Sequence, residues 1–320
     1  MALSGSTNYS TTRDDIITEA LQICGVVGEN ETPSSGKLSD CNRTLNMMIE
    51  AWQSDGLQLW VQDEIVCFFI KDKQTYKLGT NGNRACLSDE LITSTLSAAA
   101  SSSDTSISVT STSGMSSSDV IGVVVDSEDI HWTTISSVDS STALTLTDAL
   151  DDDAASGNKI FTYTTAYTER PLRINDAFVR LSDNQDQPVR IISREEYYNL
   201  TPKTTSSYAL ELYFDPQLTN AEYKVWPVAG QDNLSNELHL IVHRPFQYFT
   251  SGSDNPHFPS EWYLVLSWGL AYYLTTKYDV PAGKHDRIEK TFMLLKEKLL
   301  GWDTENMTSM YLAPSMEDYY

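Results

Sequence analysis

The sequence predicts an α+β protein in which helices from the two ends of the chain form one helical module around a β-rich middle. Three observations support this fold class. Apolar residues recur at helical spacing in the first 60 residues and again after residue 256. Between them lie short runs of β-branched and aromatic residues separated by turn signals. The most regular of these runs fall within residues 94–165, which predicts a small β-sandwich or barrel inserted into the middle.

The shifts in composition divide the chain into four expected parts. They are a helical module of residues 1–60 with 256–306, a β-rich domain of residues 61–93 with 166–255, the inserted domain of residues 94–165, and an extended C-terminal arm of residues 307–320.

The overall composition limits the classes of function. A chain of 320 residues with 40% hydrophobic residues can bury a substantial core. Its net charge of −22 disfavours general binding to nucleic acid or to an anionic membrane surface, because both need clustered Lys and Arg. The N-terminus shows no basic segment followed by an apolar run, so no secretory signal is expected.

Two helices are expected at the start of the chain. In "TTRDDIITEALQICG" the residue Thr12 suits the N-cap, Asp14 and Asp15 suit the positive end of the helix dipole, and Gly25 suits the C-terminal end. In the second segment, "LSDCNRTLNMMIEAWQSDG", Ser39 is the expected cap and Gly56 the expected stop. Its apolar stripe consists of Cys41, Leu45, Met48, Ile49 and Trp52.

The insert is rich in Ser and Thr and contains ten acidic residues against one base, Lys159. Such a composition is also typical of a low-complexity linker. Five evenly spaced β-branched and aromatic runs argue against a linker and predict strands: "TSISVTS", "DVIGVVVD", "HWTTISSV", "TALTLTDAL" and "NKIFTYTT".

The last third of the chain is expected to be helical again. The run "WYLVLSWGLAYYL" is 13 residues long with only Ser267 as a polar break, which is shorter than the ~20 residues that a membrane span needs. A helix running from near Ser260 to Tyr278 and apolar on nearly all sides fits a buried position or a subunit contact better than an aromatic ligand box. The candidate residues for core and subunit contact are Trp262, Leu266, Trp268, Tyr272 and Tyr273. A second helix is expected from Ala282 to about Trp302.

The histidines and cysteines do not form a recognisable metal or redox motif. Cys24, Cys41, Cys67 and Cys86 are widely spaced and include no C-x-x-C pair, so buried free thiols are expected. His239 and His243 are four residues apart, but "ELHLIVHRP" reads as an alternating strand, which would separate them by more than ~12 Å.

The charged residues also give no clear site. The acidic stretches Asp126–His131 and Asp148–Ser156 lack the spacing of a calcium loop and are expected to be solvated turns, although calcium binding stays open. Glu195 and Glu196 are adjacent and cannot converge on one substrate like paired glycosidase carboxylates. Five arginines are expected either on a solvated strand face or against phosphate or an acidic neighbour: Arg170, Arg173, Arg180, Arg190 and Arg194. No nucleophile, metal or nucleotide motif occurs. We therefore expect no catalytic residue, cofactor or metal, and a protein that is not an enzyme.

The stretches "IITEALQICGVVGENE" and "LSDCNRTLNMMIEAWQSDGLQLW", and later "PVRIISREEYYNL" and "LHLIVHRPFQYFTSGSDNPHFPSEWYLVLSWGLAYYLTTKY", resemble the head-to-tail adaptor proteins of short-tailed bacteriophages. These are also called tail accessory factors or packaged-DNA stabilisation proteins. The resemblance implies a structural virion protein at the portal–tail junction, assembled in the host cytoplasm as a ring of about twelve copies. It would join the portal to a tail nozzle or hub, extend the DNA channel without sequence-specific DNA binding, and retain the packaged genome.

The resemblance also implies a portal-binding role for the C-terminal arm. Its candidate anchors are Met310, Tyr311, Leu312, Met316, Tyr319 and Tyr320. The alternative function is a β-rich tail component that anchors fibres or binds a receptor through the insert. A cell-wall hydrolase is a third class, and no motif in the sequence supports it.

Overall fold

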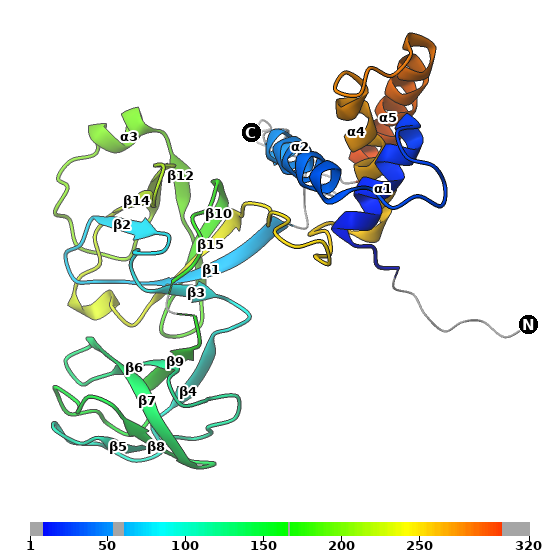
Figure 1. Cartoon of the computed structure of the whole chain (residues 1–320). Coiled ribbons are helices and arrows are strands. Elements are labelled where there is room, and N and C mark those ends of the chain that lie inside the picture. Colours follow the sequence, from blue (N-terminus) through cyan, green and yellow to red (C-terminus); the bar gives the residue numbers. More distant parts are fainter. Residues whose placement is uncertain (1–8, 54–60, 166, 303–320) are drawn as a thin grey trace, which may run out of the picture. The chain divides into compact units, whose positions relative to one another are not determined.

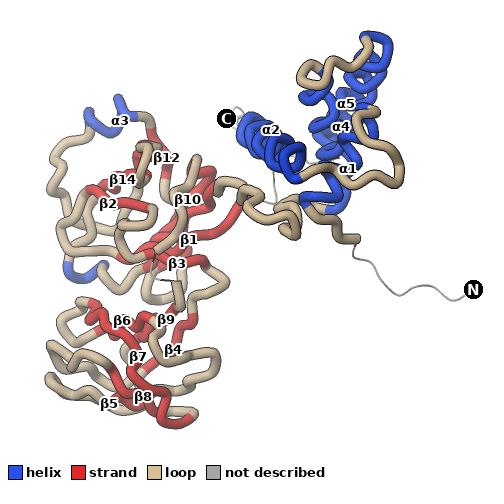
Figure 2. The backbone as a smooth tube through the Cα atoms, in the orientation of Figure 1, coloured by secondary structure: helices blue, strands red, loops and turns tan. Residues whose placement is uncertain are grey.

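The computed structural model describes residues 9–53, 61–165 and 167–302. The chain forms two compact units, one made of Met1–Val61 with Phe246–Tyr320 and the other of Gln62–Pro245 (Figure 1). Helices build the first unit and strands dominate the second (Figure 2). The predicted α+β class, with terminal helices in one module and a β-rich middle, is confirmed.

Helices from both ends of the chain surround one core in the helical unit. They are α1 (Arg13–Cys24), α2 (Ser35–Gln53), α4 (Tyr263–Thr275) and α5 (Ala282–Trp302), with the short 3-10 helix η3 (Ser260–Trp262) before α4. Trp52 of α2 lies at the centre, stacked on Phe292 with ring centroids 6.0 Å apart and tilted against Trp262 at 6.1 Å. No helix in the described ranges combines the length and the apolar character of a membrane span.

The ends of α1 are those that the sequence indicates. The Thr12 hydroxyl accepts a hydrogen bond from the Asp15 amide, and the Asp15 carboxylate accepts one from the Thr12 amide at 3.0 Å, which forms a capping box. Gly25 ends the helix in the left-handed region with φ 74°. A residue with a side chain is strained at such a φ, so glycine suits this position.

The start of α2 differs from the expected one. The helix begins at Ser35, before Ser39, so Ser39 is not its cap. Ser34 precedes it, and its carbonyl accepts from the Leu38 amide at 3.0 Å. Leu38 is half-buried and packs against the helical core. Tertiary packing thus stabilises the first turn, which lies before the apolar stripe that begins at Cys41. The expected stop, Gly56, lies outside the described residues.

The β unit contains a sandwich of two sheets with a shared apolar core. A five-stranded sheet has the order β11-β10-β15-β1-β3, and a four-stranded sheet has the order β12-β13-β14-β2. The strands of the first are β1 (Gln62–Phe68), β3 (Ala85–Leu87), β10 (Arg173–Arg180), β11 (Asp186–Pro188) and β15 (Glu237–His243). Those of the second are β2 (Thr75–Leu78), β12 (Arg190–Ile192), β13 (Glu211–Asp215) and β14 (Ala221–Trp226), and a 3-10 helix, η2 (Gln231–Asn233), precedes β15.

A short helix, α3 (Arg194–Asn199), follows β12 where the sequence analysis expected continuing β structure. Ser193 and Glu196 form its capping box, so Glu196 has a local structural role. Tyr197 packs with Tyr213 and Ile192 against the four-stranded sheet. A helix of six residues is too short to show the repeated apolar spacing by which sequence analysis finds helices.

The insert forms a closed barrel, which decides between the two predicted forms. Its order is β4-β9-β6-β7-β8-β5. The strands are β4 (Ile92–Thr95), β5 (Ser106–Ser108), β6 (Val120–Val124), β7 (Ile130–Ser140), β8 (Ala143–Leu146) and β9 (Lys159–Tyr163). The chain after β4 pairs back onto β5, since the Ser97 amide donates to the Ser108 carbonyl and the Thr110 amide to the Thr95 carbonyl, both at 2.9 Å. Closure leaves no free edge between these two strands.

The barrel covers the face of the five-stranded sheet that points away from the four-stranded sheet. Phe68 of β1 stacks on Tyr163 of β9 at 5.9 Å and meets Trp132 of β7 edge-on at 4.7 Å. Nearby, Lys159 of the barrel lies 3.7 Å from the buried carboxylate of Glu237. The five-stranded sheet is therefore covered on both faces.

The boundary at which the chain leaves the β unit and returns to the helical unit lies earlier in the sequence than expected. Residues 246–255 were expected in the β-rich domain, but Phe246 and Phe249 are buried in the core of the helical unit. The Asn46 side chain of α2 holds this segment by exchanging two hydrogen bonds with the Phe249 backbone, at 3.0 and 3.1 Å.

Candidate functional site

The five residues predicted for core and subunit contact, on η3 and α4, divide between the two roles. Trp262 and Leu266 are buried in the helical core. Trp268 and Tyr272 are half-buried, and Tyr273 is 43% exposed. Tyr272 stacks on Phe292 at 5.5 Å, so part of its surface is already used within the unit. Tyr273 is thus the most available of the five for a neighbouring molecule.

Other apolar side chains on α4 and α5 also face outward. Leu264 on α4 is 53% exposed, and Met293 and Leu294 on α5 are 49% and 52% exposed. The sequence analysis did not select these three. Ile288, Phe292, Leu295 and Leu299 supply the inward stripe of α5, so Met293 and Leu294 lie outside it. Contiguous apolar patches are typical of contact surfaces, whereas single exposed apolar residues are normal on any protein.

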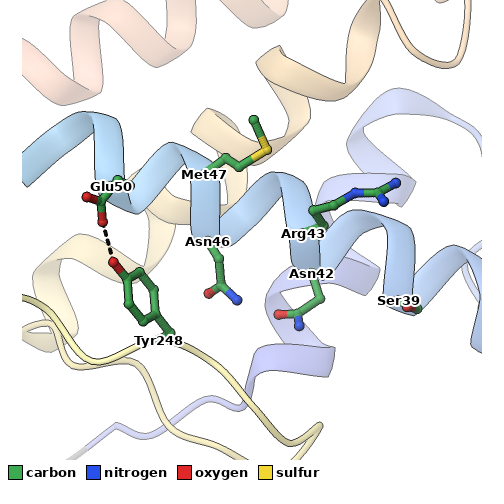
Figure 3. A pocket seen from close by; sticks show the side chains of 7 residues that line it. All are labelled: Ser39, Asn42, Arg43, Asn46, Met47, Glu50 and Tyr248. Carbon is green, nitrogen blue, oxygen red and sulfur yellow. Dashed lines mark hydrogen bonds between the residues drawn. The ribbon is translucent and has the colours of Figure 1, made fainter.

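A groove of about 510 Å³ runs along α2 (Figure 3). Seven residues line it: Ser39, Asn42, Arg43, Asn46, Met47, Glu50 and Tyr248. Met47 is 67% exposed and Tyr248 is 52% exposed, so both offer apolar surface to a partner. Sequence analysis missed them, although Met47 is visibly outside the stripe of Leu45, Met48 and Ile49.

Hydrogen bonds fix the walls of this groove. The Tyr248 hydroxyl donates to the Glu50 carboxylate (Figure 3). Asn42 donates through Nδ2 to the Phe249 carbonyl at 3.4 Å, while its buried Oδ1 has no hydrogen-bond partner among the described residues. The groove thus offers amide, carboxylate, phenol and thioether groups, which suits contact with a protein segment. It contains no nucleophile paired with a base.

An ion-paired cluster ties α2 to the turn after α4. The Asp40 carboxylate lies 2.6 Å from Lys277 Nζ and 2.7 Å from a guanidinium nitrogen of Arg43. The hydrogen bond from Lys277, assisted by Arg43, holds the pKa of Asp40 below its ordinary value. This cluster is structural, since both cations come from the helical unit itself.

The four cysteines are buried and free, as the sequence analysis expected. Burial raises the pKa of Cys24 to about 11 and that of Cys67 to about 12, and it also raises the pKa of Cys41 and Cys86. Thiols with raised pKa values in apolar surroundings are poor nucleophiles.

His239 and His243 lie in β15, so they are strand residues, as expected. The strand is buried along nearly its whole length and does not alternate, because the sheet is covered on both faces. His239 is enclosed, with Nδ1 2.6 Å from Glu64 and Nε2 3.5 Å from Glu237. Glu64 belongs to β1 and Glu237 to β15, so these contacts of His239 lie within the five-stranded sheet.

In the acidic turns of the insert, carboxylates accept hydrogen bonds from backbone amides and from a side chain of the insert itself. Asp126 accepts from the Ala155 amide at 2.8 Å and from the Asn158 side chain at 2.9 Å. Asp153 accepts from the Ser102 amide at 2.7 Å. Turns of this kind need no cation to be formed.

All five arginines contact groups within the chain. Arg170 donates to the Gln217 carbonyl at 3.5 Å, and Arg173 donates to Asn175 Oδ1 at 2.7 Å. Arg180 forms two hydrogen bonds with Asp186, at 2.8 and 2.9 Å, and Arg190 forms one with Glu211 at 2.6 Å. Arg194 lies over the Tyr198 ring at 5.8 Å. Acidic neighbours in the protein's own sheets thus pair with two of these charges.

One group in the described ranges has the composition of a metal site. His285, Asp286 and Glu289 of α5 place their ligand atoms within 4.8 Å of one another. The sequence analysis did not select these three residues.

The predicted arm residues, from Met310 to Tyr320, lie outside the described residues. Comparison with known proteins finds no protein-family model and no curated protein that matches the chain.

Proposed function

We propose that this protein is a ring-forming structural adaptor that joins the portal of a short-tailed phage to its tail and extends the DNA channel. The observation that carries the proposal is the helical unit built from both ends of the chain, with outward apolar residues on α4 and α5. A unit with a complete core and additional exposed apolar residues is suited to contact further copies of itself or the portal.

Two further observations agree with a structural role. The net charge of −22 suits a conduit, since like charge suppresses contacts with DNA phosphates and lets the duplex slide. In the described part of the chain, the groove on α2 contains groups suited to protein contact and no paired nucleophile and base. The proposed partners are other copies of this chain, the portal protein, and a tail nozzle or hub protein.

Native mass spectrometry and negative-stain imaging test the proposal, with the purified chain alone and mixed with portal rings. The wild-type chain is expected to form a ring or to bind the portal. The double variant Leu264→Asp/Tyr273→Asp should reduce assembly strongly, because it places charge at two exposed apolar positions of α4. Leu218→Asp is the matched control, since Leu218 is 90% exposed but belongs to the β unit. A wild-type chain that stays monomeric and ignores portal rings would defeat the proposal.

The C-terminal arm has a separate test within the same assay. A chain truncated after Asp303 is expected to lose portal binding while its circular dichroism spectrum stays unchanged, because the predicted anchors follow Asp303 and the described core of the helical unit is built from residues before it. Unchanged portal binding would remove the arm from the proposal without affecting ring formation.

A β-rich tail component that anchors fibres is the second candidate. The observation in its favour is the closed barrel with its own apolar core, an arrangement that presents loops on a rigid support. In that case, substitutions on exposed barrel residues would abolish fibre or receptor attachment and leave portal binding intact.

A further inference from the structure

The three potential metal ligands of α5 lie close together on one side of its first turns. His285, Asp286 and Glu289 occupy positions i, i+1 and i+4, and their ligand atoms all lie within 4.8 Å of one another. The Nε2 atom of His285 is 4.0 Å from Oε2 of Glu289. Ligands at about 2.1 Å from one ion are at most about 4.2 Å apart, so only small side-chain movements separate this arrangement from a coordination shell.

A hydrogen bond from outside the group fixes which nitrogen of His285 is available. The Thr275 hydroxyl on α4 donates to the Tyr272 carbonyl at 2.6 Å, so its single proton is used. It can therefore only accept from His285 Nδ1, which lies 2.9 Å away. The proton of the neutral imidazole is thus on Nδ1, and the lone pair on Nε2 is directed at the carboxylate side.

The ring is held in this orientation from a second direction. The Tyr272 ring stacks on the imidazole with centroids 5.9 Å apart and an angle of 22°. Thr275 is 2% exposed, so its hydroxyl is a fixed part of the helical unit. Histidines that bind metals are oriented in the same way, by a partner that accepts the proton of the other ring nitrogen.

The charges of the group are otherwise unbalanced. Among the described residues, Asp286 forms no ion pair with a Lys or Arg, and the contact of Glu289 with His285 is its only ion pair. The lone pair and the two carboxylates lie close together, and a cation placed between them removes their mutual repulsion.

We infer that His285, Asp286 and Glu289 bind a divalent transition-metal ion, for which Zn²⁺ is the probe. One imidazole nitrogen with two carboxylates suits zinc and its neighbours in the first transition series, whereas Ca²⁺ and Mg²⁺ take oxygen ligands. Three protein ligands leave a coordination position for water or for a group from another molecule. The ion would also connect the first turns of α5 to α4 through Thr275.

Isothermal titration of the full chain with ZnCl₂ in a non-chelating buffer tests the site. One Zn²⁺ per chain is expected, and His285→Gln, Asp286→Asn and Glu289→Gln should each weaken binding at least about 10-fold. His257→Gln, which removes a histidine elsewhere in the helical unit, should leave the affinity unchanged. CaCl₂ and MgCl₂ should give no binding that depends on His285.

Two further measurements separate ligation from a structural effect. Thr275→Val is nearly isosteric and should weaken Zn²⁺ binding about 10-fold, because it removes the acceptor that orients the ring. With Co²⁺ in place of Zn²⁺, the visible absorption bands of the bound ion should change in His285→Gln. Circular dichroism confirms that each variant is folded. Absence of Zn²⁺ binding by the wild-type chain, or binding that His285→Gln leaves unchanged, would overturn the inference.

Discussion

At the scale of single residues, Cys24 shows how a buried thiol can make the helical unit sensitive to alkali. Its sulfur donates to the Ala271 carbonyl of α4 at 3.4 Å, so the thiol stands at the contact between α1 and α4. Burial raises its pKa to about 11 from an ordinary value of 9.0. The folded unit therefore holds the thiol proton more tightly than the unfolded chain does.

This raised pKa predicts a loss of stability at high pH. The stabilisation by the protonated thiol is complete below pH 9 and is lost as the pH rises from about 9 to 11, because the unfolded chain ionises first. The half-buried Tyr278 has a hydroxyl pKa raised by desolvation too, which acts in the same direction. The urea midpoint of the helical unit, monitored by the hydrogen exchange of α1, should decrease as the pH is raised from about 8.5 to 11. Cys24→Ala should show a shallower fall over this range; an identical slope would contradict the role of Cys24.

Residues whose role is local were the ones that the sequence identified best. Thr12 and Gly25 act as caps through contacts with their own helix, and local contacts are visible in a local pattern. Ser39 was assigned wrongly because a Ser before an apolar stripe resembles a cap even when packing of Leu38 extends the helix. The spacing of His285, Asp286 and Glu289 is visible in the sequence, but the sequence does not show that Thr275 of another helix orients the imidazole.

At the scale of elements, Gly269 marks the closest approach of α4 to its neighbours. A Cβ at this position would lie 3.0 Å from Phe292 and from Trp52 and 3.1 Å from the Met48 sulfur. These distances are shorter than ordinary van der Waals contacts. Trp52 and Phe292 are stacked on each other and buried, so neither ring can move away easily.

The expected effect of Gly269→Ala is therefore a net loss of stability. Alanine favours a helix over glycine by about 0.5–1 kcal/mol, but overpacking a dense core costs about 1–3 kcal/mol. Gly283→Ala is the matched control, because this glycine is also in a helix and its Cβ would meet nothing within 4 Å. Urea denaturation of the helical unit should show destabilisation for the first variant and a small stabilisation for the second. Equal gains in both would refute the close approach.

Elements whose apolar residues repeat over several turns were predictable from the sequence. Short elements, and strands buried on both faces, were less predictable. The helix Ala282–Trp302 was found with its bounds, since its inward residues repeat over several turns. The strand β15 was expected to alternate between buried and exposed residues, but the barrel covers one of its faces and the second sheet covers the other. Sequence patterns do not show which element covers a given face, because that depends on contacts distant in the chain.

At the scale of the whole molecule, the placement of the barrel was the least predictable feature. The insert looked like a separate domain, yet Phe68, Val66 and Cys86 of the host sheet share an apolar cluster with it. Phe68 is 3% exposed, with Phe161, Trp132 and Tyr163 of the barrel as its ring contacts. Removing the barrel would thus expose an apolar face of the host sheet.

Deletion of residues 95–165 is accordingly expected to destabilise the β unit and lower its solubility, rather than to remove a peripheral module. Adding Phe68→Ser to the deletion should recover part of the solubility, because it reduces the newly exposed apolar surface. Val138→Asp is the matched control on the intact chain, since Val138 lies in β7 and is 38% exposed. Thermal unfolding of the three variants measures the effect, and a deletion variant as stable as the wild type would show that the barrel does not support the host sheet.

The Val138→Asp variant also separates the two proposed functions. Loss of fibre attachment with intact portal binding in this variant would favour the fibre-anchoring function over the adaptor.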